Sequence, residues 1–375
     1  NYSLSVLPLF ILMGLLIEKG GMAKQLYKSA YTFLGDKKGG LAMSTVVACG
    51  MFSAISGSSI ATAATMSKVA MPEMRRYKYA DSLSTASIAA GGTLGILIPP
   101  SVILVIYGIL TEQSIGKLFM AGFLPGMMGI LFYTLAVYFV VSRNPSLGPA
   151  GEKSNWTQRI IALKNVWSTI ALFVFVIGGI FIGLFSATEA AGMGAAGAFL
   201  IVLLSGNLKL SGFLDVFRDA SLLAAKLFAL LFGASMFSNF LNRAGFTDAL
   251  LGIINSFELS GIAVIFIILL IYILLGCIFE SMSMILLTVP IFAPLVQTLG
   301  FDLIWFGILV VVVTEISLIT PPIGLNVFVL KGVIKNVSVG TIFYGVTPFW
   351  ISDIIRLLIL TLIPGIALFL PSMMF

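Results

Sequence analysis

The chain has 375 residues, of which 59% are hydrophobic and only 10% are charged, and its formal net charge is +6. This composition excludes a soluble globular domain and is typical of a polytopic membrane protein. The chain contains no histidine, which removes the most common proton shuttle, the Ser-His-Asp triad and most zinc sites. It also lacks a GxxxxGK[ST] motif. We therefore predict a transporter driven by an ion gradient, and not an enzyme or an ATP-driven pump.

Apolar stretches follow one another along the whole chain. A helix needs about 20 apolar residues to cross a bilayer core of roughly 30 Å. We expect a lysine-bearing segment at 22–38 to lie along the inner membrane surface as an amphipathic helix. The predicted spans lie near residues 3–18, 82–110, 118–142, 166–185, 189–206, 221–243, 303–332 and 345–370.

The apolar stretch 41–71 is not predicted to be a simple span, because basic residues flank it on both sides. Lys37 precedes it, and Arg75 and Arg76 follow it. Basic residues mark the cytoplasmic side of a membrane protein. We therefore expect this stretch to enter from the cytoplasm and turn back as a hairpin. Glycine and serine residues at 53–59 can satisfy the broken backbone at the turn.

A second predicted hairpin occupies residues 261–298, with its turn at 279–283. The segment 142–164 between the two halves is polar, basic and contains proline and glycine, which predicts a cytoplasmic connection. In this topology most of the 21 Lys and Arg residues lie on the cytoplasmic side. The second hairpin then opens from the outside, opposite to the first.

The two halves repeat the same pattern about 224 residues apart. Gly21 matches Gly245, Gly116 matches Gly340, and Pro99–Pro100 matches Pro321–Pro322. Duplicated hydrophobic halves interrupted at matching Gly and Pro positions are typical of secondary transporters with the substrate site between two inverted repeats. We predict an all-α membrane fold with a first repeat at 1–142, a connecting linker with scaffold helices at 143–220, and a second repeat at 221–375.

Each repeat combines a hydroxyl-rich turn with a Pro-Pro break. Glycine lets the backbone leave helical geometry, and Pro-Pro removes two donors, so carbonyl oxygens stay unpaired at membrane depth. Such carbonyls and hydroxyls suit a small cation such as sodium. Small residues also allow helices simply to pack closely, but the recurrence of both features in both halves favours ion or substrate binding.

The second half adds two carboxylates, Glu280 and Glu315. An ionisable group at membrane depth is costly and is a candidate functional residue. Two roles stay open for each of these carboxylates. It coordinates a cation directly, or it is a protonated or hydrogen-bonded carboxyl that holds the broken helices in place. Asp353 and Arg356, spaced i, i+3, are expected to pair with each other, and Glu189 is expected to stabilise the first turn of a helix.

Five motifs in order resemble the large membrane subunit of TRAP transporters, the tripartite ATP-independent periplasmic transporters. The resemblance implies sodium-coupled uptake of organic acids by an elevator motion in the bacterial inner membrane, with two or more sodium ions and no organic cofactor. The implied partners are a secreted periplasmic binding protein, a separate small four-helix membrane subunit and membrane lipid, with no role for nucleic acid. The motifs are GMFSAISGSSIATAATMSKVAMPEM (50–74), LGILIPPS, SATEAAG, GCIFESMSMILLTVPIFAPLV (276–296) and ITPPIGLNVFVLKG (319–332).

The resemblance also assigns binding residues. It implies one sodium site at Ser56, Gly57, Ser58, Ser59 and Thr93, with Gly92 beside it, and a second at Ser281, Ser283, Thr320 and Gly324, with Pro321 and Asn326 beside it. One alternative is a stand-alone sodium or proton symporter for dicarboxylates or citrate, which needs no binding protein. An intramembrane enzyme or a channel is a further alternative, which no catalytic motif or polar stripe supports.

Overall fold

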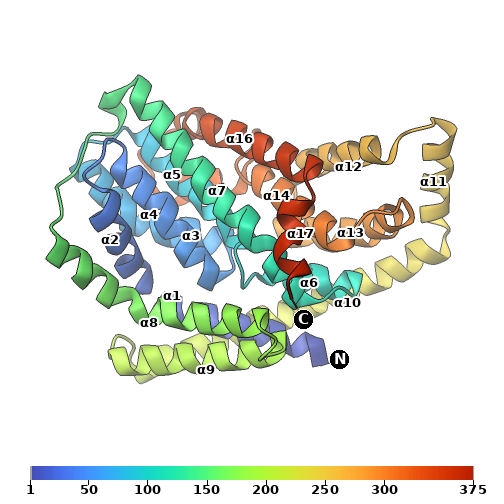
Figure 1. The fold of residues 1–375 in the computed structure, drawn as a ribbon, viewed down its shortest axis with the longest axis horizontal. Coiled ribbons are helices and arrows are strands. Elements are labelled where there is room, and N and C mark those ends of the chain that lie inside the picture. Colours follow the sequence, from blue (N-terminus) through green and yellow to red (C-terminus); the bar gives the residue numbers. More distant parts are fainter. Residues whose placement is uncertain (1, 375) are drawn as a thin grey trace.

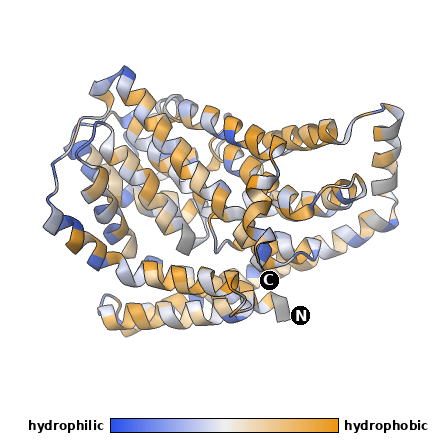
Figure 2. Cartoon of the chain, viewed as in Figure 1, coloured by the Kyte–Doolittle hydropathy of each residue, from blue (hydrophilic) through white to orange (hydrophobic). Residues whose placement is uncertain are grey.

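The computed structural model describes residues 2–374, apart from the side chains of residues 2, 3, 54, 55, 242, 247, 248, 253 and 255. Every regular element within 2–374 is a helix, which confirms the predicted fold class (Figure 1). Among the described residues, six helices are long and apolar enough to cross a membrane, or seven if the bent pair of α1 and α2 counts as one span. Figure 2 shows apolar residues along most helices and hydrophilic residues concentrated in the connections.

The helices follow the predicted order of spans and hairpins. The first part contains η1 (Tyr2–Ser5), α1 (Val6–Lys19), α2 (Met22–Leu34), α3 (Gly40–Ser56), α4 (Ser59–Arg76), α5 (Asp81–Thr93), η2 (Leu94–Ile96), α6 (Val102–Thr111) and α7 (Ile115–Arg143). The middle part contains η3 (Pro145–Leu147), α8 (Trp156–Phe181), α9 (Ala187–Ser205), α10 (Leu210–Arg243) and α11 (Phe246–Ser256). The last part contains α12 (Gly261–Gly276), α13 (Ser281–Thr298), α14 (Leu303–Ser317), α15 (Leu325–Val333), α16 (Val339–Leu362) and α17 (Gly365–Ser372).

Several helix boundaries differ from the prediction. Helix α8 begins at Trp156 and not near 166, because Asn155 and Gln158 form a capping box that starts the helix inside the polar linker. Likewise α10 begins at Leu210, and α11 was not predicted at all. The predicted single span 345–370 is two helices that separate at Ile363 and Pro364, since proline lacks the donor that would continue the helix. The predicted role of Glu189 is confirmed, because it forms a capping box with Ser186 at the start of α9.

Both predicted hairpins are helix–turn–helix pairs and neither is a continuous helix. Between α3 and α4, Gly57 takes a left-handed φ of 60°, and the Ser58 side chain accepts a hydrogen bond from the Ala61 N–H to cap α4. Between α12 and α13, the Glu280 side chain caps α13. The opposite entry of the two hairpins, the inverted relation of the repeats and the proposed domain division stay predictions.

The predicted broken spans are also observed. In the first, α5 and η2 are separated from α6 by residues 97–101; in the second, α14 is separated from α15 by residues 318–324. Both proline pairs, Pro99–Pro100 and Pro321–Pro322, have cis peptide bonds. The two breaks therefore share the cis proline pair, while the second break is longer and starts its following helix at a left-handed glycine, Gly324.

The helices pack as two groups. In the first group α9 contacts α1 and α8, and α1 also contacts α10, with α8 and α9 along the lower edge of the molecule in Figure 1. This group meets the rest of the protein where α8 packs on α2, α1 on α3 and α10 on α13. The other group contains both hairpins, both broken spans, α7 and α16, and its packing is reciprocal: α4 packs on α15 and α13 on α6, while α5 packs on α16 and α7 on α14. Each half thus supports the broken span of the other.

Candidate functional site

The turn of the first hairpin lies directly on the first broken span. A Cβ placed on Gly95 would come within 3.0 Å of the Ser58 carbonyl oxygen, and one on Gly57 within 3.4 Å of the Pro100 oxygen. Gly92 makes the same kind of close approach to the backbone of Ala63. Glycine at these positions lets two backbones meet without side chains between them. The structure therefore brings together the predicted Ser56–Ser59 turn and the 91–100 break.

Hydroxyl and carbonyl oxygens line this junction. The Ser56 and Thr62 hydroxyls lie 2.8 Å apart, and Ser59 is buried. In the part of the chain that the structure describes, the carbonyl oxygens of Pro99 and Pro100 accept no hydrogen bond. The two unpaired carbonyl oxygens agree with the expectation for the Pro-Pro break, and the sodium site itself stays a prediction.

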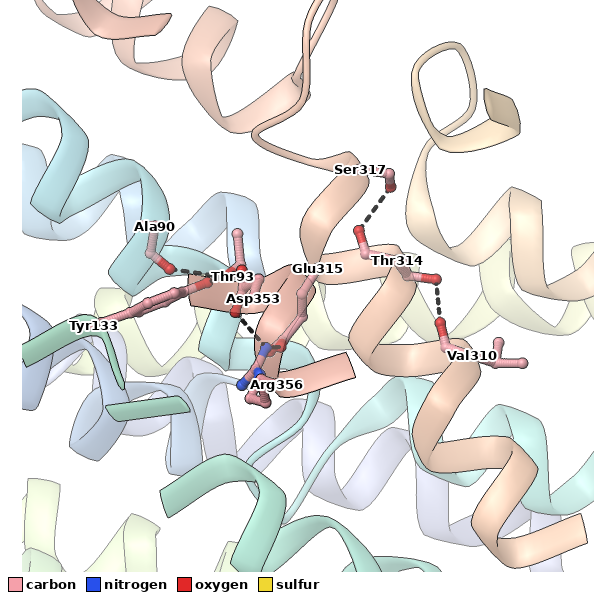
Figure 3. A network of polar contacts seen from close by, with 9 residues as sticks. All are labelled: Ala90, Thr93, Tyr133, Val310, Thr314, Glu315, Ser317, Asp353 and Arg356. Carbon is pink, nitrogen blue, oxygen red and sulfur yellow. Dashed lines mark hydrogen bonds and ion pairs between the residues drawn. The ribbon is translucent and has the colours of Figure 1, made fainter. Parts of the chain in front are cut away.

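Thr93 faces another set of partners. Its hydroxyl donates to the Ala90 carbonyl at 2.8 Å and lies 3.1 Å from the Tyr133 hydroxyl on α7. Tyr133 in turn donates to Asp353 on α16. Thr93 therefore connects the first broken span to a polar network (Figure 3). The predicted role of this hydroxyl as a sodium ligand stays a prediction.

Arg356 is the centre of the network. Its Nη2 lies 2.9 Å from Asp353 Oδ1, which confirms the predicted pair, and it also contacts Glu315 Oε2 on α14. Figure 3 shows the three side chains converging, with Tyr133 reaching them from α7. All three are fully buried. Of the two interpretations of Glu315, these contacts support the bracing one, because its carboxylate is held by Arg356.

Three glycines let α7 approach this region closely. A Cβ on Gly122 would lie 2.7 Å from the Leu97 oxygen, one on Gly126 would lie 2.7 Å from Ile98, and one on Gly129 would lie 2.8 Å from Leu94 and would overlap the Arg356 guanidinium. Because these glycines have no side chains, α7 packs closely on the first break and the buried Arg356 side chain fits beside it. Neither this glycine row nor Tyr133 was predicted from the sequence; the spacing of the glycines on one predicted helix was the available signal.

The second hairpin contacts the second broken span through the end of its first helix. Cys277 Sγ lies 3.4 Å from the Pro321 oxygen, and Gly276 packs against the Ser317 side chain. Glu280 accepts hydrogen bonds from the Met282 N–H at 3.0 Å and the Ser283 N–H at 3.4 Å. Glu280 is thus a helix cap in this structure, and its carboxylate also lies at the turn where a cation was predicted.

The predicted residues of the second break have mixed surroundings. Thr320 donates to the Ile316 carbonyl and accepts from the Trp350 indole at 2.9 Å. Gly324 takes a φ of 55° that favours glycine, and Pro321 is exposed. Ser281 is buried, and its hydroxyl has no hydrogen-bond partner among the described residues. Within residues 2–374, no hydrogen bond joins Ser281 or Ser283 to Thr320 or Gly324. The residues predicted for the second sodium site are therefore less completely assembled than those predicted for the first.

Asn326 links the two breaks. It is fully buried, its Nδ2 donates to the Ala89 carbonyl on α5 at 3.1 Å, and its Oδ1 has no hydrogen-bond partner in the described part of the chain. The two candidate regions are therefore connected twice, through Asn326 and through the Arg356 network. Residues that are more than 200 positions apart in the sequence are therefore neighbours in the fold.

Comparison with known proteins identifies the family. Residues 1–366 match the family described as "Tripartite ATP-independent periplasmic transporter, DctM component". The chain is 34% identical over 375 residues to the C4-dicarboxylate TRAP transporter large permease protein DctM of Pseudomonas aeruginosa, covering 99% of this chain and 87% of that protein. It is 33% identical over 378 residues to the ectoine TRAP transporter large permease protein TeaC of Halomonas elongata, covering 100% and 87%.

Solved structures share the fold at low sequence identity. The YdaH transporter of Alcanivorax borkumensis matches with a TM-score of 0.70 and 12% identity over 96% of this chain and 85% of that one. MtrF of Neisseria gonorrhoeae matches with a TM-score of 0.63 and 13% identity over 96% and 80%. The family match and the curated relatives confirm the resemblance seen in the motifs: the chain belongs to the DctM component family of tripartite ATP-independent periplasmic transporters, multi-pass membrane subunits that are not enzymes.

Proposed function

We propose that this chain is the large permease subunit of a sodium-coupled importer of small organic acids in the bacterial inner membrane. It receives its substrate from a periplasmic binding protein and works with a small four-helix membrane subunit. Relatives are named for C4-dicarboxylates, ectoine and sialic acid, which share a carboxylate. A relative named as a fused permease, DctMQ of Oleidesulfovibrio alaskensis, of which the chain covers 58%, supports the pairing with a second membrane component.

One observation carries the proposal: each helix–turn–helix pair is seated on a broken span. At these points α3, α5, α12 and α14 end and α4, α6, α13 and α15 begin. Helix N-termini stabilise anionic groups, while helix C-termini and unwound carbonyls coordinate cations. The same small region thus suits a carboxylate substrate together with sodium, and each ion lowers the cost of burying the other.

We assign the first sodium to the junction of Ser56–Ser59 with the break near Thr93, and the second to the turn at Ser281 and Ser283 with Thr320 and Gly324. Glu280 lies at the second turn and contributes charge there. Glu315 braces the broken helix through Arg356.

We further propose an elevator motion. The contact group α1, α8, α9 and α10 acts as the scaffold, and the group with the hairpins and broken spans moves as one body. Substrate and sodium together order the hairpin turns, so a partly loaded carrier moves slowly. This couples uptake to the sodium gradient.

The test is uptake in liposomes that contain the permease with its small subunit, in the presence of the binding protein and a radiolabelled C4-dicarboxylate, ectoine or sialic acid. We expect accumulation that needs both an inward sodium gradient and the binding protein. Equal uptake without the binding protein would support a stand-alone symporter instead. Uptake driven by a proton gradient alone would remove sodium from the mechanism.

Ser58 gives a sharper test of the first sodium site. Ser58→Leu should abolish sodium-driven uptake in a protein that stays folded. Ser338 caps α16 in the same way, through a hydrogen bond from the Thr341 N–H, and is exposed far along the chain from both turns. Ser338→Leu loses a cap of similar strength, about 1 kcal/mol, and should keep normal sodium dependence. Normal sodium dependence in Ser58→Leu would exclude the assignment.

A further inference from the structure

A basic cleft lies between α2 and α4, away from the candidate transport site. Its volume is about 560 Å³, within the range of small-molecule sites. Tyr27, Tyr31 and Tyr77 form its apolar wall, and Lys24, Lys28, Lys68 and Arg76 add positive charge against Glu73 and Glu152. The tyrosines and lysines together are typical of the membrane–water interface.

Most of this positive charge is unused within the protein. Arg76 pairs with Glu73 at 3.8 Å. No carboxylate in the described part of the chain lies within ion-pair distance of Lys24, Lys28 or Lys68. Lys68 acts on the Glu18 carboxylate only through longer-range electrostatics. Three ammonium groups without a direct ion pair thus line one cleft.

The two helices that form the cleft lie where the membrane surface is expected. The axis of α2 turns by 68° from that of α1, and α2 buries Met22, Leu26 and Tyr27 while Lys24 and Lys28 stay exposed. Such a helix lies along an interface. The basic residues mark this interface as the cytoplasmic one.

The depth of Lys68 agrees with this placement. Helix α4 starts at Ser59, which the proposed topology places near the middle of the membrane. Lys68 follows nine residues later, a rise of roughly 14 Å at about 1.5 Å per residue. That is about half of the roughly 30 Å hydrocarbon core. The Lys68 backbone therefore lies at the edge of the hydrocarbon core, from which its long side chain extends toward the phosphate groups of the inner leaflet.

We propose that this cleft binds the phosphate headgroup of an anionic phospholipid of the cytoplasmic leaflet. Lys24 and Lys28 hold the phosphate from α2, and Lys68 holds it from α4. Basic pockets between membrane helices on the cytoplasmic side bind such headgroups. Because α4 is the second helix of the first hairpin, the lipid ties α2 to an element of the transport site.

The test measures lipid retention, which does not depend on the proposed transport function. The permease is purified from membranes, mixed with phosphatidylglycerol in detergent and analysed by native mass spectrometry. Lys24→Gln/Lys28→Gln/Lys68→Gln should bind phosphatidylglycerol roughly a hundredfold more weakly. The triple arginine variant at the same positions should keep the binding, because it keeps the charge.

The matched control is Lys37→Gln/Lys38→Gln/Lys164→Gln. It removes the same charge from exposed lysines of the same predicted face that do not line the cleft. Normal lipid binding in this control, with loss in the cleft variant, supports the proposal. Equal loss in both variants, or equal retention in both, would overturn it.

A second arm distinguishes the lipid from a soluble anion. The wild-type protein is titrated with inorganic phosphate and with glycerol 3-phosphate in lipid-free detergent, with thermal stabilisation as the readout. We expect no stabilisation by either and clear stabilisation by phosphatidylglycerol. Saturable stabilisation by the soluble phosphates that the cleft variant loses would identify a soluble-anion site and overturn the lipid assignment.

Discussion

The two breaks share a cis Pro-Pro pair but have different surroundings. Every residue from 91 to 108 is buried, whereas Pro321, Pro322 and Ile323 are exposed. Ser101, the residue after the first proline pair, is fully buried; Ile323, the residue after the second, is 37% exposed. The first break is enclosed by the protein and the second is open.

The helices that cover the breaks explain this difference. Helix α7 approaches the first break through Gly122, which faces the Leu97 carbonyl oxygen, and through Gly126, which faces the Ile98 side chain. At the offset of 224 residues, the matching position to Gly126 on α16 is Trp350. The Trp350 indole donates a hydrogen bond to the Thr320 hydroxyl at 2.9 Å, so a large side chain stands between α16 and the second break. A duplicated sequence thus fixes where the backbone breaks, while a few positions on the covering helices decide how open each break is.

The charges differ between the halves as well. The first junction is built from hydroxyls and carbonyls, and the second half contributes Glu280, Glu315, Asp353 and Arg356. We infer that access and charge are functions of the second half and that the first half supplies a closed, neutral site. The following changes test this comparison.

The largest effect is expected for Arg356→Gln. It leaves Glu315 and Asp353 fully buried without a positive partner, which should lower the free energy of unfolding by about 3–5 kcal/mol. Thermal unfolding in detergent measures the loss. Arg218→Gln, an exposed arginine on α10, is the control and should change little. An unchanged midpoint for Arg356→Gln would show that the network does not hold the halves together.

Gly126→Leu tests the enclosure of the first break. The added side chain collides with Ile98 and should cost about 1–3 kcal/mol by overpacking, with a strong loss of uptake because the break can no longer close. Gly178→Leu on α8 is the matched control, since nothing lies within 4 Å of a Cβ there. Comparable uptake in the two variants would contradict the enclosed character of the first break.

Glu280→Gln and Glu315→Gln test the roles of the two carboxylates. Glu315→Gln leaves Arg356 with Asp353 as a balanced pair and should keep part of its uptake. Glu280→Gln keeps the shape of the cap but removes the charge at the turn, so it should lose sodium coupling more severely. Uptake rates against sodium concentration decide between them. A wild-type sodium dependence in Glu280→Gln would show that Glu280 holds the turn in place and does not take part in sodium coupling.

The smallest perturbation uses the two native cysteines. Cys49 on α3 is fully buried, and Cys277 beside the second break is partly exposed; both are free. A membrane-permeant maleimide should label Cys277 in the folded protein and should label Cys49 only after denaturation. Cys277→Ser removes the native signal and serves as the control. Fast labelling of Cys49 in the native protein would mean that the first half is open as well.

The sequence predicts most of the fold, because apolar stretches, basic flanks and Gly/Pro breaks are local signals. It predicts both turns and both breaks, and the Asp353–Arg356 pair follows from helical spacing. It could not predict that Arg356 also holds Glu315, or that Thr93 contacts Tyr133, since these contacts depend on how distant helices pack. The split of α16 from α17 at Pro364 and the early start of α8 were missed for another reason, since local proline and capping effects overrode apolar length.

The burial of Arg356 has a consequence for the order in which the protein is made. Glu315 leaves the ribosome 41 residues before Arg356, and Tyr133 leaves it 220 residues before Asp353. Until α16 is synthesised, the carboxylate of α14 lacks Arg356, and the hydroxyl of α7 has Thr93 beside it but not Asp353. Insertion of the last long helix therefore completes the polar core. In a chain that stops before this helix, the Glu315 charge is unpaired, and quality-control proteases meet an incomplete membrane domain.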